Sequence, residues 1–275
     1  MEKIKFSEIE NEFEARLQKI IEKAYESTGK KVVILIDEYD KPVLDALYSE
    51  DEDANRAMLR GLYSPLKGMD SYIQFLFITG ITKVSHVNIF SGLNQLNDIS
   101  LDEAYSSICG ISETELETYF KPEIQALADQ NEYTYEETIA KLKEMYDGYH
   151  FTHDVEGVYN PFCLLKCLYT KDFGSYWFET ATPTFLIKTL QNEPMVLSNF
   201  ITGRKATENQ LRNYDPDSKN MVTVLYQSGY LTIKDFEKNK RIYFLNFPNK
   251  EIESVYLDVL LQKFVKTPED DIGRL

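Results

Sequence analysis

Cysteine, histidine and long apolar runs are scarce in this chain. Its 275 residues include three histidines and three cysteines, Cys109, Cys163 and Cys167. This odd number of cysteines, without paired-thiol spacing, argues against a disulfide framework. No apolar run reaches the ~18 residues that a membrane span needs, and the N-terminal MEKIKFSEIENEF is charged where a signal peptide is apolar. We therefore expect a cytoplasmic protein with reduced thiols and no membrane partner.

Positive charge is also in short supply. The chain has 30 Lys and Arg against 45 Asp and Glu, a net charge of -15, which repels nucleic acids and anionic membranes overall. Residues 201–250 differ, with nine basic side chains against five acidic ones. This local excess is modest, so nucleic-acid binding there is a minor alternative to a solvated surface.

Apolar residues in the first part of the chain follow two periods. Helical spacing runs from Ile9 to Ala24, whereas two later apolar runs are short and typical of strands covered on both faces. Helices that alternate with buried strands indicate a mainly parallel sheet, so residues 1–110 are predicted to be an α/β core. The predicted elements are helices over 8–27, from Pro42 and over 51–67, and strands over 32–36 and 72–83.

The rest of the chain has a different pattern. Helices with aromatic faces indicate a helical domain over 111–200, and a helix ending at Gly229 before a hairpin indicates a winged-helix-like unit over 201–260, followed by a tail over 261–275. The predicted elements are helices over 113–129, 134–147, 161–170 and 183–191, and strands over 230–234 and 241–247.

Three carboxylates follow the first apolar strand directly, in VVILIDEYDKP. The carboxyl ends of parallel strands face the crevice in which ligands bind, so Asp37 and Glu38 would lie there. An apolar strand ending in Asp-Glu has the form of a Walker B element, in which the aspartate holds magnesium and the glutamate orients the attacking water. The alternative is that Asp40 caps the helix begun at Pro42 and the other two are a solvated strand end.

A series of longer motifs occurs in a fixed order along the chain. They are VVILIDEYDKP, FLFITGITKVSHVNIFSGLNQLNDIS, MYDGYHF, VYNPFCLLKCL, YWFETATPTFLI, VLYQSGYLTI and FPNKEI. Over roughly residues 7–260 the chain resembles the bacterial AAA-ATPase-like family. That family joins a P-loop ATPase module to a helical and winged region, and often to a nuclease-like domain of the PD-(D/E)XK class.

The resemblance implies roles for four residues. Asp37 and Glu38 match the Walker B acids of the family, the first as a magnesium ligand and the second as a catalytic residue. Thr79 matches the sensor position beside the Walker B strand, and Lys83, in the GITKVS turn, is a candidate nucleotide-binding residue. Mg²⁺ and ATP are the implied cofactors.

The chain also departs from the family pattern. No GxxxxGK[ST] phosphate loop occurs in it, since STGKK and ITGRKAT both lack the required spacing. We therefore expect an incomplete P-loop NTPase-type sheet, cut at both ends, that does not bind ATP tightly by itself. The absent central strand would leave an apolar strand edge exposed, which a missing N-terminal segment or a second copy of the chain could cover.

Two functions from different classes remain open. The first is an ATPase-like module that is catalytically incomplete alone, and the second is a non-enzymatic interaction or scaffold protein.

Zinc binding at His150 and His153 is a minor alternative because no third ligand is apparent. Cys163 and Cys167 fit small core residues. The aromatic motif with Trp177, Phe178, Phe185 and Leu186 is predicted to pack between the helical and winged units.

Overall fold

The computed structural model describes residues 6–46, 49–83, 96–177, 204–212 and 221–264. The chain divides into two compact units, and each is considered separately below. Unit 1 contains the described residues up to Asp98, and unit 2 contains those from Ile99 onward. The fold is mixed α/β, with a small parallel sheet in unit 1 and an antiparallel sheet in unit 2.

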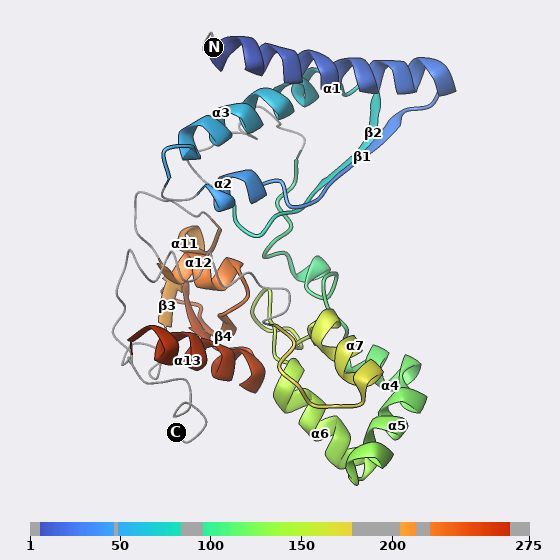
Figure 1. The fold of residues 1–275 in the computed structure, drawn as a ribbon, viewed down its shortest axis with the longest axis vertical. Coiled ribbons are helices and arrows are strands. Elements are labelled where there is room, and N and C mark those ends of the chain that lie inside the picture. Colours follow the sequence, from blue (N-terminus) through green and yellow to red (C-terminus); the bar gives the residue numbers. More distant parts are fainter. Residues whose placement is uncertain (1–5, 47–48, 84–95, 178–203, 213–220, 265–275) are drawn as a thin grey trace. The chain divides into compact units, whose positions relative to one another are not determined.

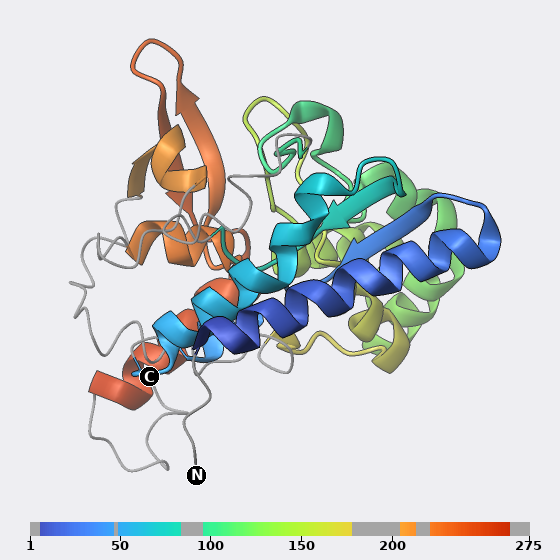
Figure 2. The same ribbon diagram turned by 90° about the horizontal axis from the view of Figure 1, so that it is seen from above.

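Unit 1 is a two-stranded parallel ribbon with helices (Figures 1 and 2). The long helix α1 packs against α3 and β1. The prediction of one helix over 51–67 is correct only in its first part, because the α-helix ends at Tyr63 and a 3-10 turn containing Pro65 follows. The elements are α1 Phe6–Thr28, β1 Val32–Ile36, α2 Lys41–Asp45, α3 Glu52–Tyr63, η1 Ser64–Gly68 and β2 Ile73–Ile78.

The strands of unit 1 are not covered on both faces, contrary to the prediction. Along β1, side chains alternate between half-buried and exposed: Val32, Ile34 and Ile36 are half-buried, whereas Val33 and Leu35 are exposed. Alternation of this kind is what a ribbon shows when only one of its faces is packed. The sequence does not distinguish the two cases, because a continuous apolar run can belong to a strand packed on one face or to a strand packed on both.

Unit 2 begins with a group of helices. The prediction of one helix over 113–129 is wrong, because Phe120 separates two helices and Pro122 occupies the first turn of the second, where its missing N–H costs nothing. The predicted helix over 183–191 lies outside the described residues. The elements are η2 Glu103–Tyr105, α4 Glu113–Tyr119, α5 Lys121–Asn131, α6 Tyr135–Tyr146 and α7 Pro161–Thr170.

The second part of unit 2 is an antiparallel sheet in the order β3-β5-β4, and the described residues between β3 and β4 include the short helices α11 and α12. The hairpin is confirmed, but its first strand runs to Glu237, so the turn is shorter than predicted. Strand β3 was not predicted, because its sequence RKAT carries no apolar alternation. The elements are β3 Arg204–Thr207, α11 Glu208–Arg212, α12 Met221–Gln227, β4 Thr232–Glu237, β5 Ile242–Asn246 and α13 Lys250–Phe264.

Two hydrophobic clusters form the core of unit 2. One lies in the antiparallel sheet region and contains Leu225 and Tyr243, and the other lies among the helices and contains Leu142 and Leu164. Trp177 packs against both clusters, which confirms its predicted position between two packed regions. Phe178, Phe185 and Leu186 lie outside the described residues.

Candidate functional site

The two strands of unit 1 end side by side. They run parallel, with Leu35 beside Phe77 and Ile36 beside Ile78, so the two strands predicted from the apolar runs are neighbours in a parallel sheet. Since the strands are parallel and in register, the residues that follow them emerge at the same sheet edge. This places Asp37 next to Thr79.

Asp37 is held in place through one of its two carboxylate oxygens. The Thr79 hydroxyl donates to Asp37 Oδ1 at 2.5 Å, and the Glu38 backbone N–H donates to the same oxygen at 3.0 Å. The side chain is exposed, and its Oδ2 atom has no hydrogen-bond partner among the described residues. The carboxylate is therefore oriented by the protein and keeps one oxygen for a cation.

Glu38 adopts an uncommon backbone conformation. Its φ is +50°, in the left-handed region that non-glycine residues rarely occupy. The turn allows Tyr39 N–H to donate to the Thr79 carbonyl at 3.0 Å, while the Glu38 side chain stays exposed. Strained residues of this kind are concentrated at functional sites.

Asp40 has a role that the sequence interpretation missed. Its side chain is completely buried and makes no capping hydrogen bond to α2, so the interpretation of Asp40 as a helix cap is wrong. Its two oxygens instead accept hydrogen bonds from Ile81 N–H at 3.1 Å, Thr82 N–H at 2.5 Å and the Thr82 hydroxyl at 2.8 Å. Asp40 therefore fixes the turn that follows β2, directly beyond Thr79.

The turn after β2 requires glycine at position 80. A Cβ atom on Gly80 would lie 2.6 Å from Asp40 Oδ1 and 2.6 Å from the Tyr39 ring, closer than real Cβ contacts. The Tyr39 hydroxyl also donates to the Thr82 carbonyl at 2.9 Å. The motifs DEYD and TGIT thus form one interlocked structure, and their joint occurrence was the sequence signal that could have identified Asp40.

Burial affects the ionisation of Asp40 and of the nearby Tyr63. Burial raises the pKa of the Asp40 carboxyl group, and the hydrogen bonds from Thr82 and Ile81 act in the opposite direction. Burial also raises the pKa of Tyr63, with a smaller contribution from the Asp40 charge. Asp40, Thr82 and Tyr63 are therefore buried polar side chains that lie close to one another.

Lys83 forms an ion pair with Asp98, whose carboxylate oxygen lies 2.7 Å from its ammonium nitrogen. Both side chains are partly accessible to water. The structure thus brings Asp37, Glu38 and Thr79 together and pairs Lys83 with a carboxylate. A phosphate at Lys83 would compete with Asp98 for its positive charge.

The strand ends supply only part of the ligand set that a hard cation such as Mg²⁺ needs. Carboxylate oxygens are ligands that Mg²⁺ prefers, and Asp37 Oδ2 can supply one. Within the described part of the chain, no three His, Cys, Asp or Glu side chains are grouped as a metal site. Most ligands of a magnesium ion here would therefore be water or phosphate oxygens, and no phosphate loop occurs in the sequence.

The histidines and cysteines considered in the sequence analysis make contacts typical of residues that support the fold. His150 Nδ1 lies 2.9 Å from the Gly148 carbonyl, and the His153 ring stacks on Phe236 with centroids 4.3 Å apart, an arrangement that gives the zinc alternative no support. Cys163 and Cys167 are completely buried, as expected of core residues, and burial raises the pKa of Cys167 to about 12.

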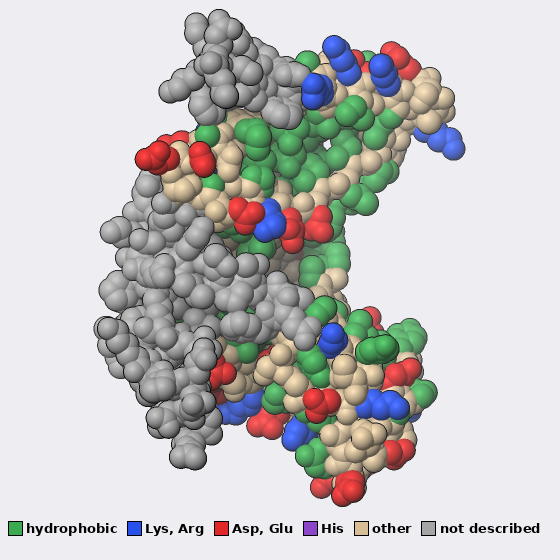
Figure 3. Space-filling view, viewed as in Figure 1, with side chains coloured by type: hydrophobic (Ala, Val, Ile, Leu, Met, Phe, Trp, Pro, Cys, Tyr) green, Lys and Arg blue, Asp and Glu red, His purple; other side chains and the backbone are tan. Residues whose placement is uncertain are grey.

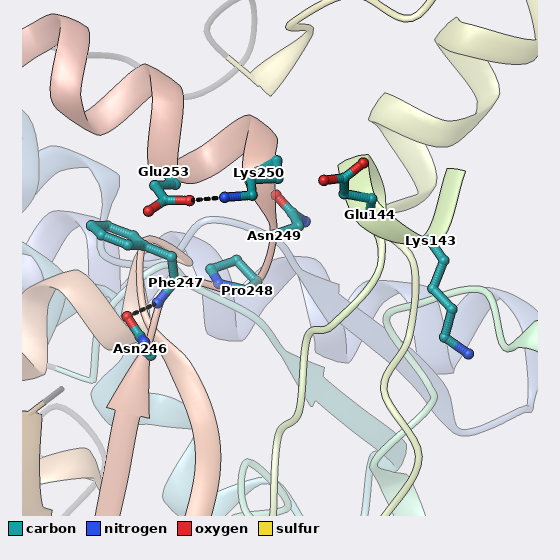
Figure 4. A pocket seen from close by; sticks show the side chains of 8 residues that line it. All are labelled: Lys143, Glu144, Asn246, Phe247, Pro248, Asn249, Lys250 and Glu253. Atoms are coloured by element: carbon teal, nitrogen blue, oxygen red, sulfur yellow. Dashed lines mark hydrogen bonds and ion pairs between the residues drawn. The ribbon is translucent and has the colours of Figure 1, made fainter. Parts of the chain in front are cut away.

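A cleft in unit 2 is lined by charged and polar side chains (Figure 4). Lys143 pairs with Glu113 at 2.7 Å, and Lys250 pairs with Glu253 at 3.0 Å, so neither lysine offers an unopposed charge. The cleft lies where the MYDGYHF and FPNKEI motifs meet: Asn249 donates to the Asp147 carbonyl at 2.9 Å and caps α13 through Ile252 N–H. These motifs therefore hold unit 2 together.

Comparison with known proteins gives a family match for the first part of the chain. Residues 1–90 match the family model described as Predicted AAA-ATPase. This part of the chain is similar to the AAA-ATPase-like family. The matched residues include all four predicted site residues, and the match is narrower than the 7–260 span over which the sequence motifs indicate resemblance.

One curated relative matches a longer part of the chain than the family model does. It is a protein of Azotobacter chroococcum mcd 1 described as an uncharacterized protein in the vnfD 5' region, 37% identical over 263 residues. The alignment covers 94% of this chain and 48% of the relative, so the chain spans about half the length of the curated protein it matches.

No solved structure matches this chain. Among the described residues, no helix is both long and apolar enough to cross a membrane.

Proposed function

We propose that unit 1 provides the Walker B and sensor elements of an ATPase-like nucleotide site. Asp37 is the magnesium ligand, Glu38 orients the attacking water, and Thr79 is the sensor that fixes the Asp37 carboxylate. The observation that carries this proposal is the hydrogen bond from Thr79 to Asp37 at the carboxyl ends of adjacent parallel strands. The match of residues 1–90 to an ATPase-like family supports it.

The same proposal limits what this chain does alone. A triphosphate would meet the carboxylates of Asp37 and Glu38 without a phosphate loop to offset its charge. The charge of Lys83 is already partly offset by its ion pair with Asp98. We therefore propose that the chain is catalytically incomplete and that Mg²⁺-ATP binds it no more tightly than about 1 mM, which is ~4 kcal/mol of binding free energy.

Titration with Mn²⁺, a paramagnetic substitute for Mg²⁺, tests the metal ligand. The wild-type chain should show a weak site by electron paramagnetic resonance, and Asp37→Asn should remove it because the oriented carboxylate is lost. Asp51→Asn is the control, since Asp51 is exposed and begins α3 without a side-chain capping bond. A Mn²⁺ site that survives Asp37→Asn would contradict the assignment.

Calorimetry with Mg²⁺-ATP tests the second part. Binding at micromolar concentration would show that another set of groups forms a phosphate site, and Lys83→Ala would then reveal whether Lys83 belongs to it. Glu38→Gln should leave Mn²⁺ binding within about twofold of wild type, since Glu38 is assigned to water and not to the metal.

A second candidate is a non-enzymatic interaction protein. The exposed apolar side chains of the β1–β2 ribbon support it, because soluble proteins rarely leave such faces uncovered. The order β3-α11-α12-β4-β5 in unit 2 fits a winged-helix-like unit. Its hairpin is partly neutralised, since Lys240 pairs with Glu237 and Arg241 with Glu208, so nucleic-acid binding is the weaker form of this alternative.

A further inference from the structure

One edge of strand β1 is open in the described structure. The other edge bonds to β2: Val32 N–H donates to the Tyr72 carbonyl at 2.7 Å, and the Ile36 carbonyl accepts from Thr79 N–H at 2.8 Å. In a strand, the backbone groups of successive residues point to opposite sides. The N–H and C=O groups of Val33 and Leu35 therefore point away from β2, and no described strand pairs with them.

The same residues also form an exposed apolar face. The Val33 side chain is 55% exposed and that of Leu35 is 71% exposed, and Phe75, beside Val33 on β2, is 53% exposed. The Phe75 ring stacks against Phe77. Hydrophobic side chains gather between α1 and the ribbon in Figure 3. An open strand edge with an apolar face is a template for pairing with another strand.

The charges that flank β1 show which strand fits this edge. Two lysines precede the strand and two acids follow it, in KKVVILIDE. If a second β1 lies antiparallel with the two Ile34 residues opposite each other, Lys31 faces Asp37 and Val33 faces Leu35. Opposite charges and apolar pairs directly across two strands stabilise a sheet. A parallel pairing in the same register would place Lys31 opposite Lys31 and Asp37 opposite Asp37.

The backbone geometry allows this antiparallel register. The pairs that it creates, Val33 with Leu35 and Lys31 with Asp37, join odd-numbered residues, whose N–H and C=O groups face the open edge. All four side chains lie on the exposed face. Asp37 Oδ2 can accept from the second copy's Lys31 while Oδ1 stays bonded to Thr79, so the dimer contact and a bound cation would compete for this oxygen. Lys31 now donates to the Asp70 carbonyl at 3.1 Å and is exposed, so it is accessible for exchange.

We propose that this chain forms a two-fold symmetric dimer in which the β1 strands of two copies pair antiparallel about Ile34. The interface is self-complementary, as a two-fold contact requires. It joins β1 and β2 of each copy into one sheet and makes the apolar face continuous. The proposal does not depend on the ATPase-like role of Asp37, because it uses the strand edge and the charge order.

Sedimentation equilibrium of the full chain over a range of concentrations tests the dimer. The wild-type chain should interconvert reversibly between monomer and dimer. Lys31→Asp and Asp37→Lys should each raise the dissociation constant about tenfold or more, because each places like charges opposite each other twice. The variant that combines both substitutions should have a dissociation constant close to that of the wild type, because opposite charges again face each other in both pairs.

Leu35→Lys tests the apolar part of the interface and should also weaken the dimer about tenfold. Its control is Ile20→Lys, because Ile20 lies on α1 and is similarly exposed at 64%, and this change should leave the dissociation constant within about twofold. Circular dichroism identifies any variant that fails to fold.

Amide hydrogen exchange of the wild-type chain gives a test without substitutions. On dimerisation the Val33 and Leu35 amides should become protected, whereas those of Val32 and Ile34 should change little because they already face β2. A chain that stays monomeric at several hundred micromolar would overturn the proposal. So would a dimer that is insensitive to the charge exchange, or one without new protection at Val33 and Leu35. Loss of the Mn²⁺ site alone would leave the dimer proposal standing.

Discussion

At the scale of single residues, Asp40 is the side chain on which the candidate site depends. Its carboxylate satisfies three donors in the turn after β2, all of them in Ile81 and Thr82. Asp40→Ala would leave these buried donors without an acceptor, at ~1 to 3 kcal/mol for each group that stays unsatisfied. We expect a loss of at least ~2 kcal/mol in the free energy of unfolding, measured with urea.

Asp51→Ala is the matched control for this change. Both aspartates begin a helix without a side-chain capping bond, but Asp51 is exposed. Its replacement should change stability by less than ~0.5 kcal/mol. Equal effects of the two substitutions would contradict the structural role of Asp40.

The stability contributed by Asp40 should also depend on pH. Burial raises its pKa above the ordinary value of 3.8, so the folded state holds the proton more strongly than the unfolded state. The resulting stabilisation is complete below that ordinary value and is lost as the pH rises through the raised pKa. Urea unfolding from pH 3.5 upward should show this decline in the wild type and a flatter profile in Asp40→Asn.

At the scale of elements, Trp177 connects the two hydrophobic clusters of unit 2. Its ring stacks on Tyr149 with centroids 6.1 Å apart and meets Tyr230 edge-on at 6.2 Å. Gly229, at φ +83°, leaves room for it, since a Cβ there would lie 2.8 Å from the indole ring. The VLYQSGYLTI and YWFETATPTFLI motifs therefore meet at this ring.

Trp177→Ala should destabilise the fold by ~3 to 5 kcal/mol, because it removes a large side chain from two packed clusters. Tyr169→Ala on α7 is the control, since that side chain is 86% exposed, and it should cost less than ~0.5 kcal/mol. An unchanged midpoint of thermal unfolding in Trp177→Ala would show that the residue is a surface feature.

At the scale of the whole molecule, the chain divides into two compact units, and both hydrophobic clusters described above belong to unit 2. Multidomain chains often unfold in more than one step. Trp177 is the only tryptophan and belongs to unit 2, so its fluorescence reports on that unit, whereas far-ultraviolet circular dichroism reports on both. We expect the two urea transitions not to coincide, and superimposable curves would indicate one cooperative unit.

Most of the site followed from the sequence because it depends on local order along the chain. An apolar run followed by DEYD predicts a strand ending in acids, and a second such run ending in TGIT predicts its neighbour. The parallel arrangement of the strands followed from the alternation of helices and strands, whereas the position of Thr79 beside Asp37 was implied by the family resemblance. The metal and nucleotide roles of Asp37, Glu38, Thr79 and Lys83 stay predictions.

The sequence by itself determined the positions of β1, α7 and the hairpin, because apolar period, proline and glycine act within a few residues. Only the tertiary structure decided that Asp40 binds the turn after β2 instead of capping α2, that Lys83 pairs with Asp98, and that one face of the ribbon is exposed. Each of these depends on contacts between segments distant in sequence. A carboxylate or an apolar side chain has the same local pattern whichever distant group it meets, so such contacts are fixed only when the chain packs.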